Sequence, residues 1–198
     1  MLRIDSNRPT YLALRQRWAH YLTVFVALSL IIGGLALRSQ IQSAVTRYVD
    51  TRIGIEAAYP ANWLIETNVD DVAFRVRNMA LAGYKSNIQI TVRPVSGETT
   101  ERNIGDQLAL ERSLVLTDYR VISVEDFDLN GQRAQAITYT YASQESSPFL
   151  QGIPIVVEGL DILLIQREQA IVITFRAQAE SFESERHYFD RFLQNLEF

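Results

Sequence analysis

The chain has 198 residues, no cysteine and a formal net charge of −4, so it has neither a disulfide framework nor a thiolate metal site. The charge is unevenly distributed, because residues 1–49 carry six arginines and one aspartate, whereas residues 50–198 carry 13 basic and 22 acidic groups. The acidity of this larger part argues against nucleic-acid binding, which needs a basic surface.

The first predicted element is a transmembrane helix over residues 18–37. This run has no formal charge, and ten of its 20 side chains are Leu, Ile, Val or Phe. A helix of that length is roughly 30 Å long, which matches the hydrocarbon core of a bilayer. Trp18 and Tyr21 stand where an interfacial aromatic belt is expected. A buried core helix is disfavoured, because the run has no polar face.

The arginines around this span predict its orientation. Four arginines and one aspartate precede it, whereas only Arg38 and Arg47 follow it closely. Since positive charge favours the cytoplasmic side, we expect a single-pass protein of the cell membrane. Residues 1–17 would form a cytoplasmic basic tail, and the C-terminal part would be extracytoplasmic. A cleaved signal peptide is the alternative, but its apolar region is usually about 7–15 residues long, so we expect an uncleaved signal anchor.

Residues 38–50 are predicted to continue the helix as a stalk. An apolar stripe with helical spacing supports this prediction, and its members are Ile41, Ala44, Val45, Tyr48 and Val49. The stripe packs either on the protein's own domain or on a helix of a partner, and the sequence favours neither.

Residues 51–198 are long enough for one domain with its own core. Most segments show the alternation typical of strands, and two show the helical period. The expected strands are 52–59, 63–66, 72–77, 87–95, 119–129, 132–141, 155–166 and 170–178, and the expected helices are 103–117 and one after Ser181. Because hairpins dominate and no βαβ unit repeats, we predict an α+β domain with an antiparallel sheet flanked by helices.

One turn and two strands of this domain allow more specific predictions. The dipeptide Asn130-Gly131 predicts a tight hairpin turn. Residues 160–165 do not alternate, so this strand is expected to be central and covered on both faces. Residues 87–95 do alternate and predict a half-buried strand, with Ile88, Ile90 and Val92 on one face and Gln89, Thr91 and Arg93 on the other.

Each predicted helix is expected to bury one face. The helix over 103–117 has an apolar face with one acidic residue at its edge, formed by Ile104, Leu108, Leu110, Glu111, Leu114 and Val115. The last helix is expected to place an aromatic stripe in the core, formed by Phe182, Phe189, Phe192, Leu193 and Leu196.

Four segments follow one another in a recognisable order and spacing. They are Tyr59-Pro60-Ala61-Asn62-Trp63, the strand 87–95 ending in Arg-Pro-Val, the hairpin 119–141 around Leu129-Asn130-Gly131, and the closing helix with Phe189, Phe192, Leu193 and Leu196. Together they resemble the PsbP-like superfamily over nearly all of residues 51–198. The resemblance implies an α/β/α sandwich around an antiparallel sheet and a non-catalytic role in binding or assembling other proteins. It carries no photosystem role, because the predicted membrane anchor differs from the soluble plant protein.

Residues suited to catalysis or metal binding are scarce. His187 is the only histidine of residues 51–198, which argues against a Ser-His-Asp triad and a zinc site. Asp70 and Asp71 are adjacent in a predicted turn and are expected to be solvated. A weak calcium site is the alternative to simple solvation for Glu125, Asp126 and Asp128. With no Gly-rich phosphate loop, we expect no enzyme activity, no cofactor and no metal.

A predicted loop over 143–154 is the candidate contact with a protein partner. It contains three apolar residues, Phe149, Leu150 and Ile153, and no Lys or Arg. Either the loop folds back over these side chains, or they contact a partner or the membrane surface. The absence of basic charge argues against the membrane, because binding to anionic lipid gains from it.

The sequence therefore predicts a membrane-anchored, non-catalytic interaction or assembly module outside the cytoplasm, of the kind expected for an accessory subunit of a membrane complex. A domain that binds a small ligand or lipid at the outer membrane face is the alternative. Four aromatic residues are either part of the core or line a pocket, and their place in strands favours the core: Tyr59, Trp63, Tyr139 and Tyr141.

Overall fold

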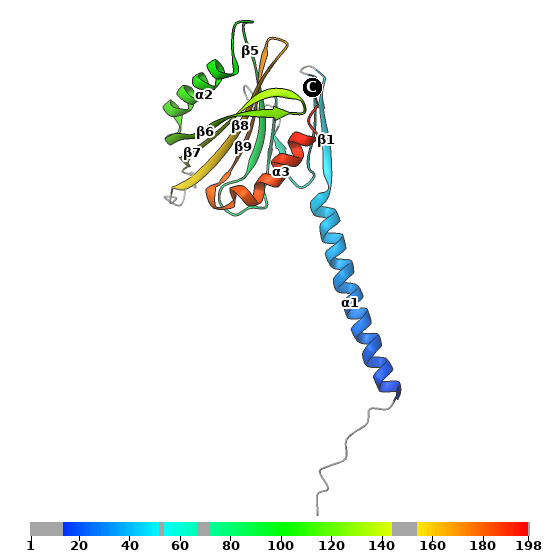
Figure 1. Cartoon of the computed structure of the whole chain (residues 1–198). Helices are drawn as coiled ribbons and strands as arrows, with labels where there is room; N and C mark the ends of the chain where they lie inside the picture. The colour runs from blue at the N-terminus through cyan, green and yellow to red at the C-terminus, as the bar shows by residue number, and fades with distance from the viewer. Residues whose placement is uncertain (1–13, 52–53, 67–71, 144–153, 198) are drawn as a thin grey trace, which may run out of the picture. The chain divides into compact units, whose positions relative to one another are not determined.

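The computed structural model of the chain describes residues 14–51, 54–66, 72–143 and 154–197. The chain forms two compact units, Met1–Ala44 and Val45–Phe198. The first contains the helix α1, and the second, which we call the C-terminal domain, contains all the described strands and the two other α-helices (Figure 1).

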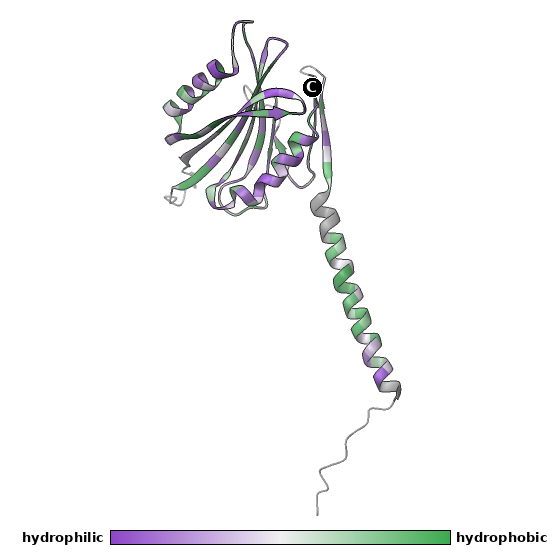
Figure 2. Cartoon of the chain, in the orientation of Figure 1, coloured by the Kyte–Doolittle hydropathy of each residue, from purple (hydrophilic) through white to green (hydrophobic). Residues whose placement is uncertain are grey.

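Helix α1 (Leu14–Ser43) confirms the helix predicted over residues 18–37. Its segment Arg17–Leu37 is long and apolar enough to cross a membrane, and none of that segment is buried. Phe25 and Leu30, for example, are 69% and 72% exposed. Figure 2 shows the hydrophobic colour along the middle of this helix. An apolar surface of this kind needs cover from lipid or from another protein.

The prediction of a helical stalk over residues 38–50 is wrong in its second half. Helix α1 ends at Ser43, and β1 (Val45–Asp50) pairs antiparallel with β2 (Ile55–Pro60) in a two-stranded sheet. Most residues of β1 are β-branched or aromatic, and such residues favour strands. Tyr48 also packs on the core of the C-terminal domain. That domain therefore begins with β1, earlier than the predicted boundary at residue 51.

The main sheet has seven strands, and each neighbouring pair is antiparallel, as predicted. Its order is β3 (Leu64–Glu66), β4 (Phe74–Arg77), β5 (Asn87–Pro94), β9 (Gln169–Gln178), β8 (Ile155–Gln166), β7 (Gln132–Ser143) and β6 (Thr117–Leu129). Strand β8 lies between β9 and β7, and its residues Ile162, Leu163 and Leu164 are at most 1% exposed. The prediction of a central strand covered on both faces is confirmed.

Helix α3 (Phe182–Gln194) covers one face of this sheet, after a turn of 3-10 helix at Ala179–Ser181. Phe189 stacks on Phe175 of β9 with ring centres 5.3 Å apart. The predicted aromatic stripe is confirmed, because all its members are buried: Phe182, Phe189, Phe192, Leu193 and Leu196. Since each such side chain contributes about 1.5–3 kcal/mol when buried, this face holds the main core.

Helix α2 (Glu101–Val115) covers the opposite face and completes the predicted α/β/α sandwich (Figure 1). Thr100 and Asn103 form a capping box at its start. Ile104 and Leu108 then pack on β8 and β9. The predicted apolar face is wrong for three residues, because Leu110, Leu114 and Val115 are 63%, 80% and 82% exposed.

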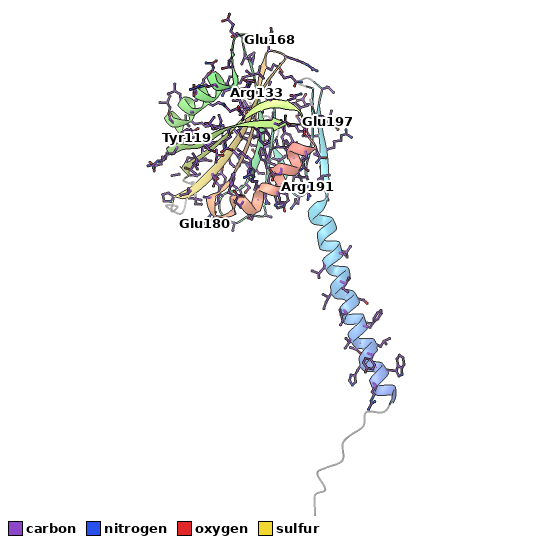
Figure 3. The ribbon with its side chains drawn as sticks, in the orientation of Figure 1. Tyr119, Arg133, Glu168, Glu180, Arg191 and Glu197 are labelled. Atoms are coloured by element: carbon purple, nitrogen blue, oxygen red, sulfur yellow. The ribbon has the colours of Figure 1, made fainter. Side chains whose placement is uncertain are left out.

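The predicted hairpin between β6 and β7 is confirmed. Asn130 and Gly131 have φ values of 52° and 83°, as a type I′ turn requires. The Asn130 amide donates to the backbone oxygens of Leu193 and Leu196, each at 3.2 Å, which ties the hairpin to the end of α3. Glu197 follows there and exchanges backbone hydrogen bonds of 3.0 and 2.9 Å with Glu56 of β2 (Figure 3).

Candidate functional site

The two faces of the main sheet differ in polarity. On the α3 side the strands present mainly Ile, Leu and Phe, whereas on the α2 side β5 and β9 present polar residues, which are Gln89, Thr91, Thr174 and Arg176. Gln89 and Thr91 are each only 8% exposed. The prediction of a half-buried strand over 87–95 is therefore wrong for the segment up to Thr91, because its polar face is covered too.

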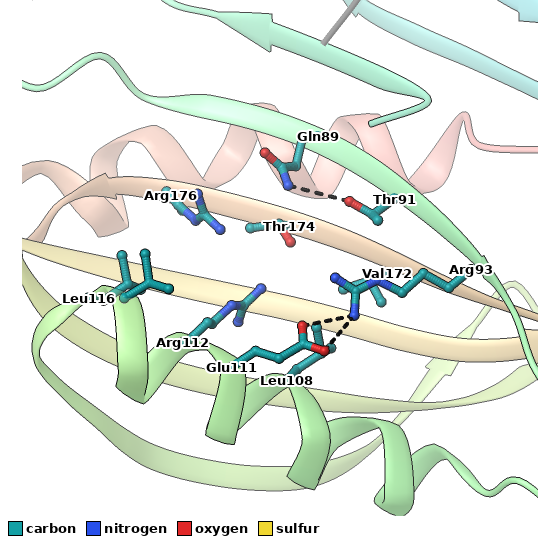
Figure 4. A pocket seen from close by; sticks show the side chains of 11 residues that line it. Gln89, Thr91, Arg93, Leu108, Glu111, Arg112, Leu116, Val172, Thr174 and Arg176 are labelled. Atoms are coloured by element: carbon teal, nitrogen blue, oxygen red, sulfur yellow. Dashed lines mark hydrogen bonds and ion pairs between the residues drawn. The ribbon is translucent and has the colours of Figure 1, made fainter. Parts of the chain in front are cut away.

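A trough made of two cavities runs along this polar face. The larger, of about 310 Å³, lies beneath α2 and is lined by residues of α2, β5 and β9 (Figure 4). The smaller, of about 220 Å³, has four cations in its wall together with Tyr84, Asn87 and Gln89. Both cavities are lined by Gln89 and Arg176. We call the two together the polar trough.

A buried ion pair fastens α2 over the trough. Arg112 binds both carboxylate oxygens of Asp161, one of them at 3.1 Å, and Asp161 is fully buried in β8. The Thr174 hydroxyl donates to the same carboxylate at 2.7 Å. This pair turns Arg112 toward the sheet, whereas Leu110 and Leu114 lie on the other side of the helix and remain in solvent.

A second ion pair lies toward the rim of the trough. Arg93 of β5 contacts Glu111 of α2 at 2.9 Å (Figure 4). The hydrogen bonds from Arg93 lower the pKa of the Glu111 carboxyl, so this side chain stays ionised. Both side chains are well exposed, and such a pair contributes little to stability.

Tyr139, Gly159 and Arg176 form a row across three strands. Tyr139 of β7 pairs with Gly159 of β8, which in turn pairs with Arg176 of β9. The Tyr139 ring occupies the space above the glycine, because a Cβ at position 159 would lie 2.3 Å from it. The Tyr139 hydroxyl accepts a hydrogen bond of 3.0 Å from Arg176 Nε. Burial raises the pKa of Tyr139 to about 12, so the phenol is neutral at physiological pH.

Arg176 differs from the other arginines of the trough in having no acid beside it. Among the described residues, the Tyr139 hydroxyl is its only hydrogen-bond partner. Arg112 is paired with Asp161, whereas Arg176 is partly buried without a carboxylate. Because buried charges are normally paired, this guanidinium marks the trough as a candidate site for an anionic group.

No protein-family model matches the chain, and a search of curated proteins found no match. Solved structures do match. The solution structure of cyanobacterial PsbP (CyanoP) from Synechocystis sp. PCC 6803 aligns with a TM-score of 0.58 and 17% identity, over 78% of this chain and 92% of that one. The C-terminal domain has the PsbP-like fold. LpqN, involved in cell envelope biogenesis of Mycobacterium tuberculosis, aligns with a TM-score of 0.54 and 10% identity, over 77% and 89%.

At these identities the likeness establishes the fold of the PsbP-like domain and leaves its function open. The resemblance inferred from the sequence is confirmed at that level. The partner-contact residues predicted in the 143–154 loop, namely Phe149, Leu150 and Ile153, lie outside the described residues. The predicted turn residues Asp70 and Asp71 also lie outside the described residues.

Two other predicted candidates of the PsbP-like domain, His187 and Asp128, form local contacts with the backbone. His187 is exposed and contacts the backbone oxygen of Ser184 at 2.7 Å. The Asp128 carboxylate accepts the Gly131 N–H at 2.9 Å and so belongs to the hairpin turn. The four aromatic residues are in the core, as favoured: Tyr59, Trp63, Tyr139 and Tyr141. In the described parts of the chain, no group of three His, Cys, Asp or Glu side chains is placed to hold a metal.

Proposed function

We propose that this protein is a single-pass, membrane-anchored, non-catalytic module that binds a protein partner outside the cytoplasm, as an accessory or assembly factor of a membrane complex. The observation that carries the proposal is a group of exposed apolar residues at one end of the main sheet. Leu114 and Val115 end α2 and are 80% and 82% exposed, and Val156 at the start of β8 is 55% exposed.

The strand register supports placing these residues at the same end. Ala142 of β7 pairs with Thr117 on one side and with Val156 on the other. Since α2 leads into Thr117 through a single residue, its last turn belongs to this end as well. The 143–154 loop joins β7 to β8 here, so Phe149, Leu150 and Ile153 are proposed to belong to the same contact surface.

A groove between α2 and β6 extends the apolar surface. It has a volume of about 460 Å³, and its lining combines the apolar residues Ala109, Val121, Val124 and Ile137 with Arg102, Asp106 and Gln135. Strand β6 is an edge strand, and among the described residues no strand pairs with its outer side, where a strand of a partner could be added. LpqN, which has a similar fold, is involved in cell envelope biogenesis, and this supports an accessory role of the same general kind.

Two double variants test the contact surface, with the full chain used to capture partners from detergent-solubilised membranes. One replaces Leu114 and Val115 by Ser, and the other replaces Phe149 and Leu150 by Ser. Loss of apolar contacts at the centre of an interface costs about 2 kcal/mol or more, so capture should fall more than about tenfold. The melting temperature should stay the same, because the first pair is already exposed.

The matched control is Leu64→Ser, which changes a 52% exposed leucine on β3, at the opposite edge of the sheet. Capture by this control should equal that of the wild type. The proposed surface is refuted if both double variants capture the same proteins in the same amounts, or if the control loses them equally.

The anchor is tested with a reporter enzyme fused after Phe198. The arginines before the apolar span 18–37 predict that the reporter is active only outside the cytoplasm. Replacing Arg15 and Arg17 by Glu should raise the fraction of chains with the opposite orientation, because it removes the charge bias. Reporter activity confined to the cytoplasm would contradict the proposed orientation, and a mature N-terminus near Arg38 would contradict the anchor.

Ligand binding by the PsbP-like domain is the second candidate function. The observation that favours it is Arg176, whose guanidinium lines both cavities of the polar trough without an acid beside it among the described residues. Calorimetric titration of the purified full chain with small anions tests this candidate without any partner protein, and saturable binding is the expected result.

A further inference from the structure

We propose that the smaller cavity of the polar trough binds the phosphate group of an organic ligand, with Arg176 as its central contact. The inference rests on the second proposed function, ligand binding, and does not require a protein partner. The wall of this cavity, of about 220 Å³, contains Arg75, Arg77, Lys85 and Arg176. Among the described residues that line it, none is a carboxylate.

Positive charge accumulates here although the domain as a whole is acidic. Arg75 and Arg77 share one carboxylate, that of Glu66, at 3.5 and 3.1 Å. Lys85 and Arg176 donate to a backbone oxygen and to a phenol, so neither forms an ion pair within the described residues. Three of the four positive charges are therefore uncompensated locally, which favours an anionic phosphate group, and most strongly a doubly charged phosphomonoester.

The arrangement of donors on Arg176 suits a phosphate. A guanidinium has five N–H donors in one plane, and only Nε is used, in the bond to Tyr139. The four remaining donors have no acceptor among the described residues. Such a fork binds two phosphate oxygens at once, whereas an ammonium group acts as a single point charge.

Arg176 is held in place by its neighbours, so it does not need to be ordered by the ligand. The buried Tyr139 ring lies over Gly159, and its hydroxyl accepts from Nε at 3.0 Å. Figure 4 shows Arg176 on β9, on the side of the sheet that faces α2. A site built on a central strand loses little entropy on binding, which raises its affinity.

The larger cavity provides space for the organic part of the ligand. Because both cavities are lined by Gln89 and Arg176, a ligand anchored at Arg176 extends directly into this space of about 310 Å³. Its wall combines the hydroxyl groups of Thr91 and Thr174 and apolar residues such as Leu108 with the ion-paired side chains of Arg93, Glu111 and Arg112. A mixed wall suits a body that is part polar, such as glycerol, and both a soluble phosphomonoester and a phospholipid headgroup have this chemistry.

Calorimetric titration of the full chain in micelles of an uncharged detergent tests the inference and identifies the source. One arm uses glycerol 3-phosphate, and the other adds phosphatidylglycerol to the micelles, with phosphatidylcholine for comparison. Saturable binding is expected in at least one arm. Because each charge-assisted hydrogen bond is strong, Arg176→Gln should weaken that binding by about tenfold or more.

Arg133→Gln is the matched control, since this arginine is exposed on the β6–β7 hairpin and outside the trough (Figure 3). Its affinity should equal that of the wild type. If Arg176→Gln fails to fold, the double variant Lys85→Gln/Arg77→Gln replaces it as the test. Its affinity for the probe should fall by at least about tenfold. The inference is overturned if neither probe binds, or if affinity survives unchanged in the trough variants. Loss of phosphate binding leaves partner capture unaffected, so the two proposals fail separately.

Discussion

Replacing Gly159 by alanine is expected to destabilise the PsbP-like domain by about 3 kcal/mol, the upper part of the usual range for overpacking. The added methyl group would lie between 2.3 and 2.6 Å from three atoms of the Tyr139 ring and hydroxyl. That ring is fully buried and has no free direction, because the Arg112 guanidinium lies 4.5 Å from its centre and Arg176 holds its hydroxyl. Urea unfolding of the full chain in micelles measures the change.

The sign of this effect follows from the collision alone. In a strand, alanine normally gains about 0.5–1 kcal/mol over glycine, because it loses less backbone entropy. The control Gly97→Ala places its Cβ where no atom lies within 4 Å, so its stability should change by less than about 0.5 kcal/mol. Gly159→Ala combined with Tyr139→Leu should recover part of the loss. An unfolding midpoint of Gly159→Ala equal to the wild type would show that the ring moves freely.

The sheet was predictable because its strands repeat a simple physical pattern. Residues 160–165 are almost all apolar. The absence of alternation between apolar and polar residues is typical of a strand that is covered on both faces. Asn130 and Gly131 adopt positive φ at low energetic cost, so these two residues were enough to predict the turn between β6 and β7. The closing helix was equally clear, because its phenylalanines share one stripe, in which Phe182 and Phe189 pack on Phe175 of β9.

The errors arose where tertiary contacts decided between two local patterns. Residues 45–50 have helical spacing of apolar groups, yet they form β1 because β2 offers a pairing partner. On α2, six positions suggested a broad apolar face, but Arg112 turns toward Asp161 and leaves Leu114 in solvent. Whether a segment forms a strand or buries a given face depends here on a contact that is distant in the sequence. The periodicity of a single segment carries no information about that contact.

The candidate site was missed although the sequence holds a signal for it. Asp161 lies inside the apolar run 160–165, and Arg176 is the one charge of residues 169–178, and a charge in such a place needs a partner. Sequence alone does not say that Asp161 pairs with Arg112 while Arg176 faces the trough. That distinction depends on the register of β7, β8 and β9, which places Gly159 between Tyr139 and Arg176.

Replacing Arg112 by methionine is expected to destabilise the PsbP-like domain by about 3–5 kcal/mol. The substitution leaves the Asp161 carboxylate fully buried with only the Thr174 hydroxyl as a side-chain donor among the described residues. An unpaired charge in that position costs far more than the ion pair itself contributes, because its hydration has been lost. The free energy of unfolding of the full chain in micelles gives the size of the loss.

Removing the carboxylate as well should reverse most of that loss. In Arg112→Met/Asp161→Leu no buried charge remains, and apolar replacements of a buried pair are often neutral or stabilising. The contrast is Arg93→Met, which breaks the well-exposed pair with Glu111 and should cost at most about 1 kcal/mol. A double variant no more stable than Arg112→Met would mean that the loss comes from the packing of the arginine on Tyr139. In that case α2 is held over the trough by this cation–π contact rather than by the ion pair.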